Sequence, residues 1–593
     1  MQKSKIEPYL MSVLSSRLYS IGLEMNNTMI RAARSQLMSV ARDLSTAICD
    51  RNGDVIAISD SIPVHCANMG LTVRPCFEHP DGIHPGDLFL NNSPYLGNTH
   101  HADYTYIAPI FHADELMFFV VAKGHQADCG NGIPTTYHAT AKDLYEEGAI
   151  DWPCVKIQKD YQDVPDIINV AKARIRVPDM WYRDYLAGVG ATRTGEKRLL
   201  ELCKEYGNIL IKEFCDAYQE YGKKVMIEEI KQLPKGTWTY NIKHDAIPDL
   251  IPDGVDIHIK CQVDPEEGYI TIDLRDNADC LPCGLNLCEA TTLSSARTGV
   301  LYRLPPDIPK VEGAMSRIRV LMREGCVVGK VKQPYSASLA TTNVADRLIS
   351  GVQALMNQIT DVRGLAEGGA VQCPSVSVVS GLDWRRNNEP YVNQLFCGMT
   401  GGPGTNGHDG WVTYFYPCNG GASFWNSKEV LEQQYPFKVM HEEIIPDSIG
   451  EGKFDSAPAC KFVLTPRKKP VTCAYTCDGI DNLPKGVLGG MHGHKAAAWK
   501  YTISEGEQSR AELPSFAEPE ILYGEAIVSE SSSGGGYGNP LERDPELVRH
   551  RVREGWISLE KAKEVYGVVM DTSSELYSVD INATNELRKT LEK

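Results

Sequence analysis

Stretches of helical periodicity alternate along this chain with stretches in which every second residue is apolar. From Pro8 to about Ile48, apolar residues recur at near-helical spacing, which predicts an N-terminal helix. Residues 166–206 form a second amphipathic run, and it ends at Gly207, a residue type typical of the position after a helix. Three shorter helices are predicted, at Ala290–Tyr302, at 343–359 and near 544–567.

Other segments have the pattern of strands. The turn signal RNGD at 51–54 separates two apolar runs, which predicts a hairpin. Residues 238–275 alternate between apolar and polar side chains, and 370–530 hold short β-prone runs rich in Gly and Pro. The patterns together predict a large α+β protein of several lobes, with antiparallel sheets and packed helices. They do not fit a regular βαβ alternation.

The chain has 593 residues, more than one ordinary hydrophobic core accommodates. We therefore expect several packed segments. The expected division is 1–230 with the functional site, 231–340 rich in strands, 341–520 of mixed type, and 521–593 with a Gly-rich loop and a helical tail.

The candidate chemistry lies around a second predicted hairpin. Two β-prone runs, 104–111 and 116–122, are joined by about four residues, which is most simply an antiparallel pair. Folding brings the outer ends of such a pair together, and two imidazoles and one or two carboxylates lie there. These side chains are His100 and Asp103 before the first strand, and His125 and Asp128 after the second.

The set His100, Asp103 and His125 has the composition of a catalytic metal site. Two histidines and one carboxylate leave coordination positions open, and they suit Mn²⁺, Fe²⁺ or Zn²⁺. A metal there would act as a Lewis acid or lower the pKa of water. The alternative is that these histidines only form hydrogen bonds with loop carbonyls.

Charge and composition narrow the possible partners. The formal net charge is −17 and the isoelectric point about 5.4, so the surface repels phosphate backbones and anionic lipid. The longest apolar runs are far shorter than the roughly 20 residues of a spanning helix. The N-terminus shows no signal-peptide pattern, so we expect a cytoplasmic protein that binds neither nucleic acid nor membrane. Its 18 cysteines are expected to be free thiols.

Two further motifs are weaker signals. Cys280 and Cys283 form a CxxC that could be half of a zinc site, but buried or loosely exposed thiols are the default for a lone pair. The segment GVGATRTGEK at 188–197 superficially resembles a phosphate loop. It lacks the GK[ST] ending and lies in a helical pattern, so no nucleotide site is expected on this chain.

Motifs along nearly the whole chain occur in an order known from one family. The first is PGDLFLNNSPYLGNTHHAD (85–103), followed by KGHQADCGNGIP (123–134). Others are RDLSTAICDRNGDVIA (42–57), RVPDMWYRDYLAG (176–188) and SSSGGGYGNPLERDPELV (531–548). In this order they resemble the hydantoinase B family, whose members are subunits of hydantoinases, oxoprolinases, lactam hydrolases and ketone carboxylases.

The resemblance implies an ATP-dependent enzyme with more than one kind of subunit. In the family, ATP phosphorylates a carbonyl or enol oxygen, and a separate hydantoinase-A-type chain usually binds the nucleotide. The motif match also implies that His100, Asp103 and His125 hold a divalent metal, manganese in the acetone carboxylase relatives. The same residues thus follow from the resemblance and from the predicted hairpin.

The resemblance leaves the reaction open between two classes. The chain is shorter than its acetone carboxylase counterpart and its Gly-rich tail is hydantoinase-like, which favours opening of a cyclic amide over carboxylation. For hydrolysis, Asp128 is the candidate general base, and His65 a candidate for contacting substrate or supporting a metal ligand. A third possibility is a scaffold with a structural metal. Asn92 stands where the family usually has Asp, which leaves the substrate undetermined.

Overall fold

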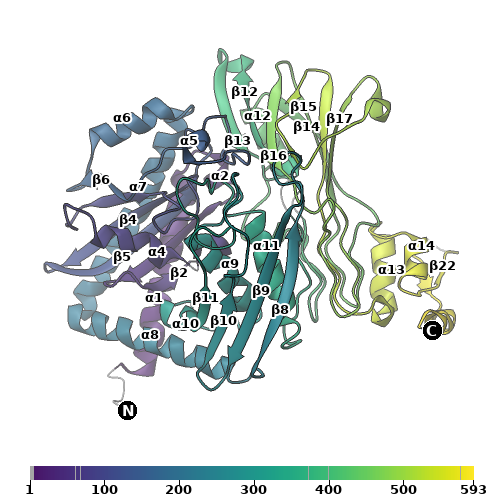
Figure 1. Cartoon of the computed structure of the whole chain (residues 1–593), viewed down its shortest axis with the longest axis horizontal. Helices are drawn as coiled ribbons and strands as arrows, with labels where there is room; N and C mark the ends of the chain where they lie inside the picture. The colour runs from purple at the N-terminus through teal and green to yellow at the C-terminus, as the bar shows by residue number, and fades with distance from the viewer. Residues whose placement is uncertain are drawn as a thin grey trace.

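Seven strands form the sheet that carries the candidate ligands (Figure 1). The computed structural model describes residues 6–59, 62–66, 68–370, 373–398, 400–573 and 576–592. Every neighbouring pair of strands in this sheet is antiparallel. In spatial order the strands are β2 (Val55–Ile58), β1 (Leu44–Asp50), β5 (Glu115–His125), β4 (Asp103–His112), β3 (Leu88–Asn91), β6 (Val155–Lys159) and β7 (Gln162–Asp163).

The predicted hairpin is the centre of this sheet. Strands β4 and β5 pair from Asp103 opposite His125 at the open end to His112 opposite Glu115 at the closed end. The connection is two residues, shorter than the four expected. Ala113 and Asp114 have φ of 51° and 61°, the left-handed conformation that tight hairpin turns require. The hairpin at 51–54, between β1 and β2, is confirmed as well.

The N-terminal helix is shorter than its pattern predicts. Helix α1 spans Pro8–Ala32, and a short helix, α2 (Gln36–Ser39), follows. The prediction of helix up to Ile48 is wrong beyond Ala32, because residues from Leu44 onward form strand β1. That strand is buried along its whole length between β2 and β5, and an apolar run buried on both faces has no period that distinguishes strand from helix.

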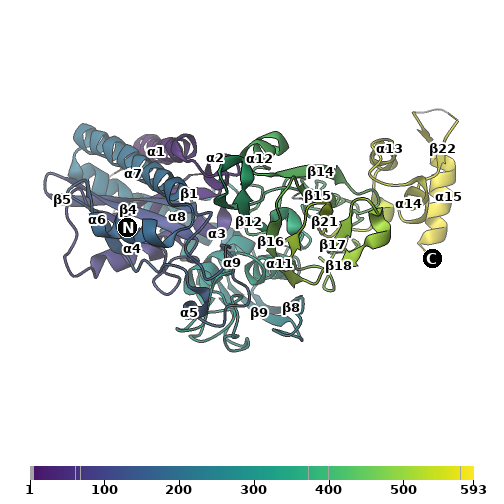
Figure 2. The ribbon, with the colours of Figure 1, turned by 90° about the horizontal axis from the view of Figure 1, so that it is seen from above.

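Helices cover both faces of the sheet (Figure 2). The predicted run 166–206 becomes α6 (Pro165–Arg174) and α7 (Pro178–Tyr206), and α7 packs with α1 over β4 and β5. Gly188 of α7 lies against the ring of Tyr106, so the helix approaches the sheet closely. On the opposite face, α4 (Met69–Phe77) packs with apolar residues of β5.

A second sheet continues the same core. One cluster of buried apolar residues extends from Ile6 to Val392 and joins both sheets. The strands predicted in 238–275 and the helices predicted at 290–302 and 343–359 are confirmed. They are β8 (Gly236–His244), β9 (Val255–Asp264), β10 (Tyr269–Asp273), α9 (Glu289–Leu301) and α11 (Val344–Met356), with α8 (Asn208–Ile230), α10 (Glu312–Met315) and β11 (Ile318–Leu321) beside them.

Two further sheets share a separate apolar core in the C-terminal half. The first contains β13 (Glu389–Gln394), β12 (Val378–Asp383), β16 (Val471–Thr476), β19 (Phe516–Ala517) and β20 (Glu520–Ile521). The second contains β14 (Phe437–Ile444), β15 (Cys460–Pro466), β21 (Glu525–Glu530), β17 (Ala497–Thr502) and β18 (Ala511–Glu512). Helix α12 (Lys428–Gln434) precedes β14. The predicted α+β architecture is confirmed, while the segment boundaries at 230, 340 and 520 stay predictions.

The C-terminal helices lie at the far end of the molecule from the seven-stranded sheet (Figures 1 and 2). The helix predicted near 544–567 is two helices, because the chain turns at Gly555 with φ of 72°. The helices of this region are α13 (Pro545–Arg553), α14 (Leu559–Glu564) and α15 (Ile581–Leu591), beside the short pair β22 (Met570–Asp571) and β23 (Ser578–Val579).

None of the 18 cysteines forms a disulfide, as expected, and 17 of them are buried while Cys66 is partly exposed. Cys280 and Cys283 belong to no group of three or more ligand side chains among the described residues. In the described ranges, no helix is long and apolar enough to cross a membrane. Residues 1–5, part of the stretch inspected for a signal peptide, lie outside the description.

The contact between α7 and the sheet yields a matched pair of substitutions. A Cβ at Gly188 would meet ring carbons of buried Tyr106 at 2.4 Å, whereas at Gly190 the nearest atom is a Thr28 methyl at 3.6 Å. Gly188→Ala should therefore lower the free energy of unfolding by roughly 1–3 kcal/mol. Gly190→Ala should leave it unchanged or raise it by up to about 1 kcal/mol, through helix propensity alone. Urea denaturation checks both, and equal effects would contradict this packing.

Candidate metal centre

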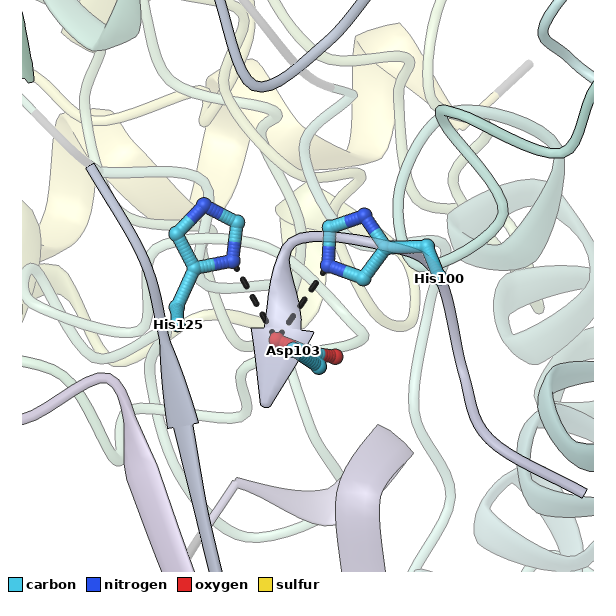
Figure 3. A group of neighbouring side chains, drawn as sticks. All are labelled: His100, Asp103 and His125. Atoms are coloured by element: carbon cyan, nitrogen blue, oxygen red, sulfur yellow. Dashed lines mark hydrogen bonds and ion pairs between the residues drawn. The ribbon is translucent and has the colours of Figure 1, made fainter. Parts of the chain in front are cut away.

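Three side chains meet at the open end of the β4–β5 hairpin (Figure 3). His125 Nδ1 and His100 Nε2 each lie 3.2 Å from the same oxygen, Oδ1 of Asp103. One ligand atom from each residue falls within 4.8 Å of the others. The arrangement arises because Asp103 and His125 are cross-strand partners, while His100 lies in the turn before β4. The cluster predicted from the sequence is therefore present.

The cluster is buried, and its surroundings favour the protonation states in which His125 and Asp103 can bind a metal ion. Asp103 is 0% exposed and both histidines are 1% exposed. Burial lowers the pKa of His125 to about 4, so its ring is neutral at neutral pH. Burial alone would raise the pKa of Asp103, but its interactions with His100, His65 and His125 outweigh burial and hold that pKa well below its usual range. A neutral imidazole and an ionised carboxylate are what metal coordination requires.

The hydrogen-bond geometry of His100 is compatible with a bound cation. His100 Nδ1 faces the carbonyl oxygen of Ser338 at 3.1 Å, and a carbonyl only accepts, so Nδ1 donates. In the neutral ring Nε2 then carries a lone pair, and this buried atom has no hydrogen-bond partner among the described residues. It points at a carboxylate oxygen, another acceptor. A metal ion between the two satisfies both, and a carbonyl at the far nitrogen is the usual support of a histidine ligand.

The second oxygen of Asp103 is held by a fourth side chain. His65, in the short helix α3 (Pro63–Cys66), places Nε2 3.1 Å from Oδ2, and its Nδ1 lies 3.1 Å from the Ser45 hydroxyl. The Thr99 hydroxyl donates to the same Oδ2 at 2.5 Å. His65 thus contacts the candidate ligand Asp103 and orients its carboxylate. Whether His65 supports a metal ligand or contacts substrate stays a prediction.

An aromatic ring covers the two candidate histidine ligands. The ring of Tyr137 stacks on His100 and His125, with centroid distances of 5.8 and 5.5 Å. Its hydroxyl lies 3.4 Å from the side-chain nitrogen of Gln394, which belongs to β13 in the C-terminal half. Both halves of the chain therefore enclose the centre.

Asp128, the other residue predicted from the hairpin, is engaged elsewhere. Its carboxylate accepts hydrogen bonds from the Arg176 backbone at 2.5 Å, the Arg176 guanidinium at 3.0 Å and the Gly130 backbone at 3.1 Å. These bonds fix the loop that follows His125. The structure does not place Asp128 in the three-residue cluster, and its role as general base stays a prediction. Neighbouring His101 likewise pairs away from the cluster, with Glu147 at 2.7 Å.

Sequence reasoning missed two ionisable residues beside the centre. The Asp43 carbonyl accepts from the His125 backbone N–H at 3.1 Å, and burial and the charge of Asp103 raise the pKa of its carboxyl. Lys123 is fully buried on β5 with its ammonium 3.3 Å from the Thr99 hydroxyl, and burial lowers its pKa to about 8. A lysine within the apolar run FFVVAKGH was a usable signal, because a buried cation needs a nearby anion.

Comparison with known proteins agrees with the motifs. Residues 7–540 match the family described as hydantoinase B/oxoprolinase. The chain belongs to this family. It is 26% identical over 582 residues to the caprolactamase subunit beta of Pseudomonas jessenii, covering 96% of this chain and 97% of that protein. It is also 23% identical over 552 residues to 5-oxoprolinase 1 of Arabidopsis thaliana, covering 90% of this chain and 42% of that protein.

Two solved structures share the fold of this family member. The crystal structure of the ATP-dependent caprolactamase from Pseudomonas jessenii aligns over 99% of this chain and 100% of that one, with a TM-score of 0.87 and 24% identity. The nucleotide-free structure of an acetone carboxylase aligns over 99% and 83%, with a TM-score of 0.87 and 18% identity. At these identities the likeness concerns the fold, and it does not choose between the two reactions.

The position of His65 predicts a graded effect on metal affinity. His65→Ala removes one of two hydrogen-bond partners of Asp103 Oδ2 and should weaken metal binding by about 10–100-fold. His65→Asn, whose amide also donates, should retain more of the affinity. Competition with a chelator measures both, with circular dichroism as the check on folding. Wild-type affinity in a folded His65→Ala variant would show that His65 does not orient the ligand.

Proposed function

We propose that this chain is the metal-binding subunit of an ATP-dependent hydrolase that opens a cyclic amide of the lactam, hydantoin or oxoproline type. The observation that carries the proposal is the buried cluster of His100, Asp103 and His125, in which both histidines face the same oxygen of Asp103 at 3.2 Å. Family membership and the similarity to a caprolactamase subunit support the substrate class.

Activation by ATP is assigned to a separate chain. Unstrained amides react slowly with water, so phosphorylation of the carbonyl oxygen by a hydantoinase-A-type partner supplies the driving force. The name of the caprolactamase relative, subunit beta, supports a hetero-oligomer. Residues 188–197, the stretch that resembles a phosphate loop, lie within helix α7 and form no loop. This supports the assignment of the nucleotide to the partner.

Within this chain each residue of the centre has a distinct task. A divalent ion such as Mn²⁺, Zn²⁺ or Fe²⁺, held by His100, Asp103 and His125, supplies Lewis acidity. His65 and Thr99 hold the second oxygen of Asp103, and Tyr137 covers the histidines. These contacts fix the ligand geometry and exclude bulk water.

Two carboxyl groups are candidates for receiving a proton from the attacking water. Asp43 has a raised pKa, and its backbone binds that of a ligand histidine. Asp128 is occupied by Arg176. A carboxyl with a raised pKa retains its own proton more readily, so Asp128 stays the predicted base, and its bonds with Arg176 also fix the loop after His125.

Carboxylation of a phosphorylated enol is the second candidate reaction. It is supported by the shared fold with an acetone carboxylase, at a TM-score of 0.87. The two reactions differ in their second substrate, because hydrolysis consumes water and carboxylation consumes bicarbonate. The identity of the product thus decides between them.

Reconstitution with a hydantoinase-A-type subunit tests the proposal. With ATP and a lactam, hydantoin or oxoproline, the expected result is a ring-opened product and an equal amount of phosphate, independent of bicarbonate. The variant His100→Ala should lose turnover and keep its unfolding midpoint, whereas Lys197→Gln, an exposed site on α7, should keep both. Dependence on bicarbonate would favour the carboxylase, and a fall in stability of His100→Ala would favour a structural metal.

A further inference from the structure

A large cavity beside the metal centre is lined by cations and not, among the described residues, by carboxylates. Its volume is about 910 Å³, within the range of small-molecule sites, and it lies between α1, α3, the end of α9 and the segment 411–424. Arg42, Lys310 and Arg363 line it. In a chain with a net charge of −17, three cations without a lining acid form a local basic site.

None of these three cations has an ion-pair partner in the described part of the chain. No carboxylate oxygen described in the structure lies within 4.0 Å of their charged nitrogens, whereas Arg297 on the neighbouring helix α9 pairs with Glu312 at 3.0 Å. All three are exposed to solvent at the rim. The Arg42 guanidinium is held 3.9 Å above the ring of Phe424. The rim therefore presents positive charge that no described residue neutralises.

The interior of the cavity is apolar. Leu44, Ile58, Leu301 and Met315 contribute to its wall, together with other aliphatic side chains. A ligand that fits has an apolar ring or chain and an anionic group at one end. A free inorganic anion would contact only the cations at the rim, and a neutral ring would contact only the apolar wall.

The cavity and the metal centre share two pieces of backbone. Arg42 and Leu44 flank Asp43, whose carbonyl accepts from the His125 backbone N–H at 3.1 Å. Pro63 and Cys66 line the cavity, and between them His65 reaches Asp103 at 3.1 Å. A ligand in the cavity thus lies directly behind two segments that position metal ligands.

We propose that this cavity receives the phosphorylated cyclic amide, with its phosphate on Arg42, Lys310 and Arg363 and its ring against the apolar wall. The proposal rests on the proposed function, because the partner's reaction makes the phosphorylated species. Arginine and lysine are the side chains that bind phosphate oxygens most strongly, and the apolar wall selects an organic phosphate over the free ion. The cavity then holds the activated substrate next to the centre that hydrolyses it.

Calorimetric titration of the purified full chain with phenyl phosphate tests this site, with phenol and inorganic phosphate as partial probes. Wild type should bind phenyl phosphate more tightly than either. The triple variant R42Q/K310Q/R363Q should weaken this binding by about tenfold or more, since charge-assisted contacts are lost. A matched triple variant, K197Q/K204Q/K260Q, removes three exposed charges outside the cavity and should bind as wild type does.

The outcomes separate this proposal from the proposed function. The double variant His100→Ala/His125→Ala should bind phenyl phosphate normally, because the probe needs no metal. Absent binding in wild type, equal binding in both triple variants, or preference for phenol would overturn the cavity proposal and leave the metal centre untouched. Loss of turnover in the metal-site variant with unchanged probe binding supports the cavity independently of the reaction. Thermal midpoints of all variants establish that they fold.

Discussion

The pairing of Asp103 with His125 across two central strands is the constraint on which the functional site depends. Side chains alternate between the faces of a sheet, so a shift by one residue would turn His125 to the face that packs against α7. The register is fixed by apolar residues on both faces, since Val120 and Ala122 face α7 and Phe119 and Val121 face α4. Core packing therefore determines the position of the candidate ligands.

The same pairing places an ionised carboxylate in the interior. An isolated buried charge is unfavourable by several kcal/mol, so Asp103 is surrounded by groups that stabilise it. His65 and Thr99 hold one oxygen, while His100 and His125 face the other. Helix α3 supplies His65, and the turn at 98–102 supplies Thr99 and His100. Segments that are distant in sequence thus all stabilise the buried carboxylate of Asp103.

Local patterns predicted the parts of this site that lie close in sequence. The hairpin needs two β-prone runs and a short turn, so His100, Asp103 and His125 could be brought together from strand lengths alone. His65, Ser338 and Tyr137 reach the centre through packing between distant segments, which periodicity does not encode. Asp128 is close to His125 in sequence but lies outside the cluster. Its carboxylate pairs with Arg176, 48 residues away, and the local pattern does not predict this pairing.

The same distinction between local patterns and distant packing applies to the prediction of the fold. Amphipathic helices such as α7 and alternating strands such as β9 were predictable, because one face is buried and the other exposed. Strand β1 was mistaken for helix, since burial on both faces removes its period. The pairing of β1 with β5 joins residues 68 to 80 positions apart and depends on the completed sheet. Tertiary packing, in these cases, overrides the local pattern.

The central claim is that the open end of the hairpin binds a catalytic divalent metal, and elemental analysis tests it most directly. Wild-type chain should contain about one Mn, Fe or Zn ion, as a single three-ligand site holds. The double variant His100→Ala/His125→Ala should contain none and remain folded, while the matched variant His84→Ala/His258→Ala should keep the metal. A metal-free wild type, or a metal that the first variant retains, would contradict the account.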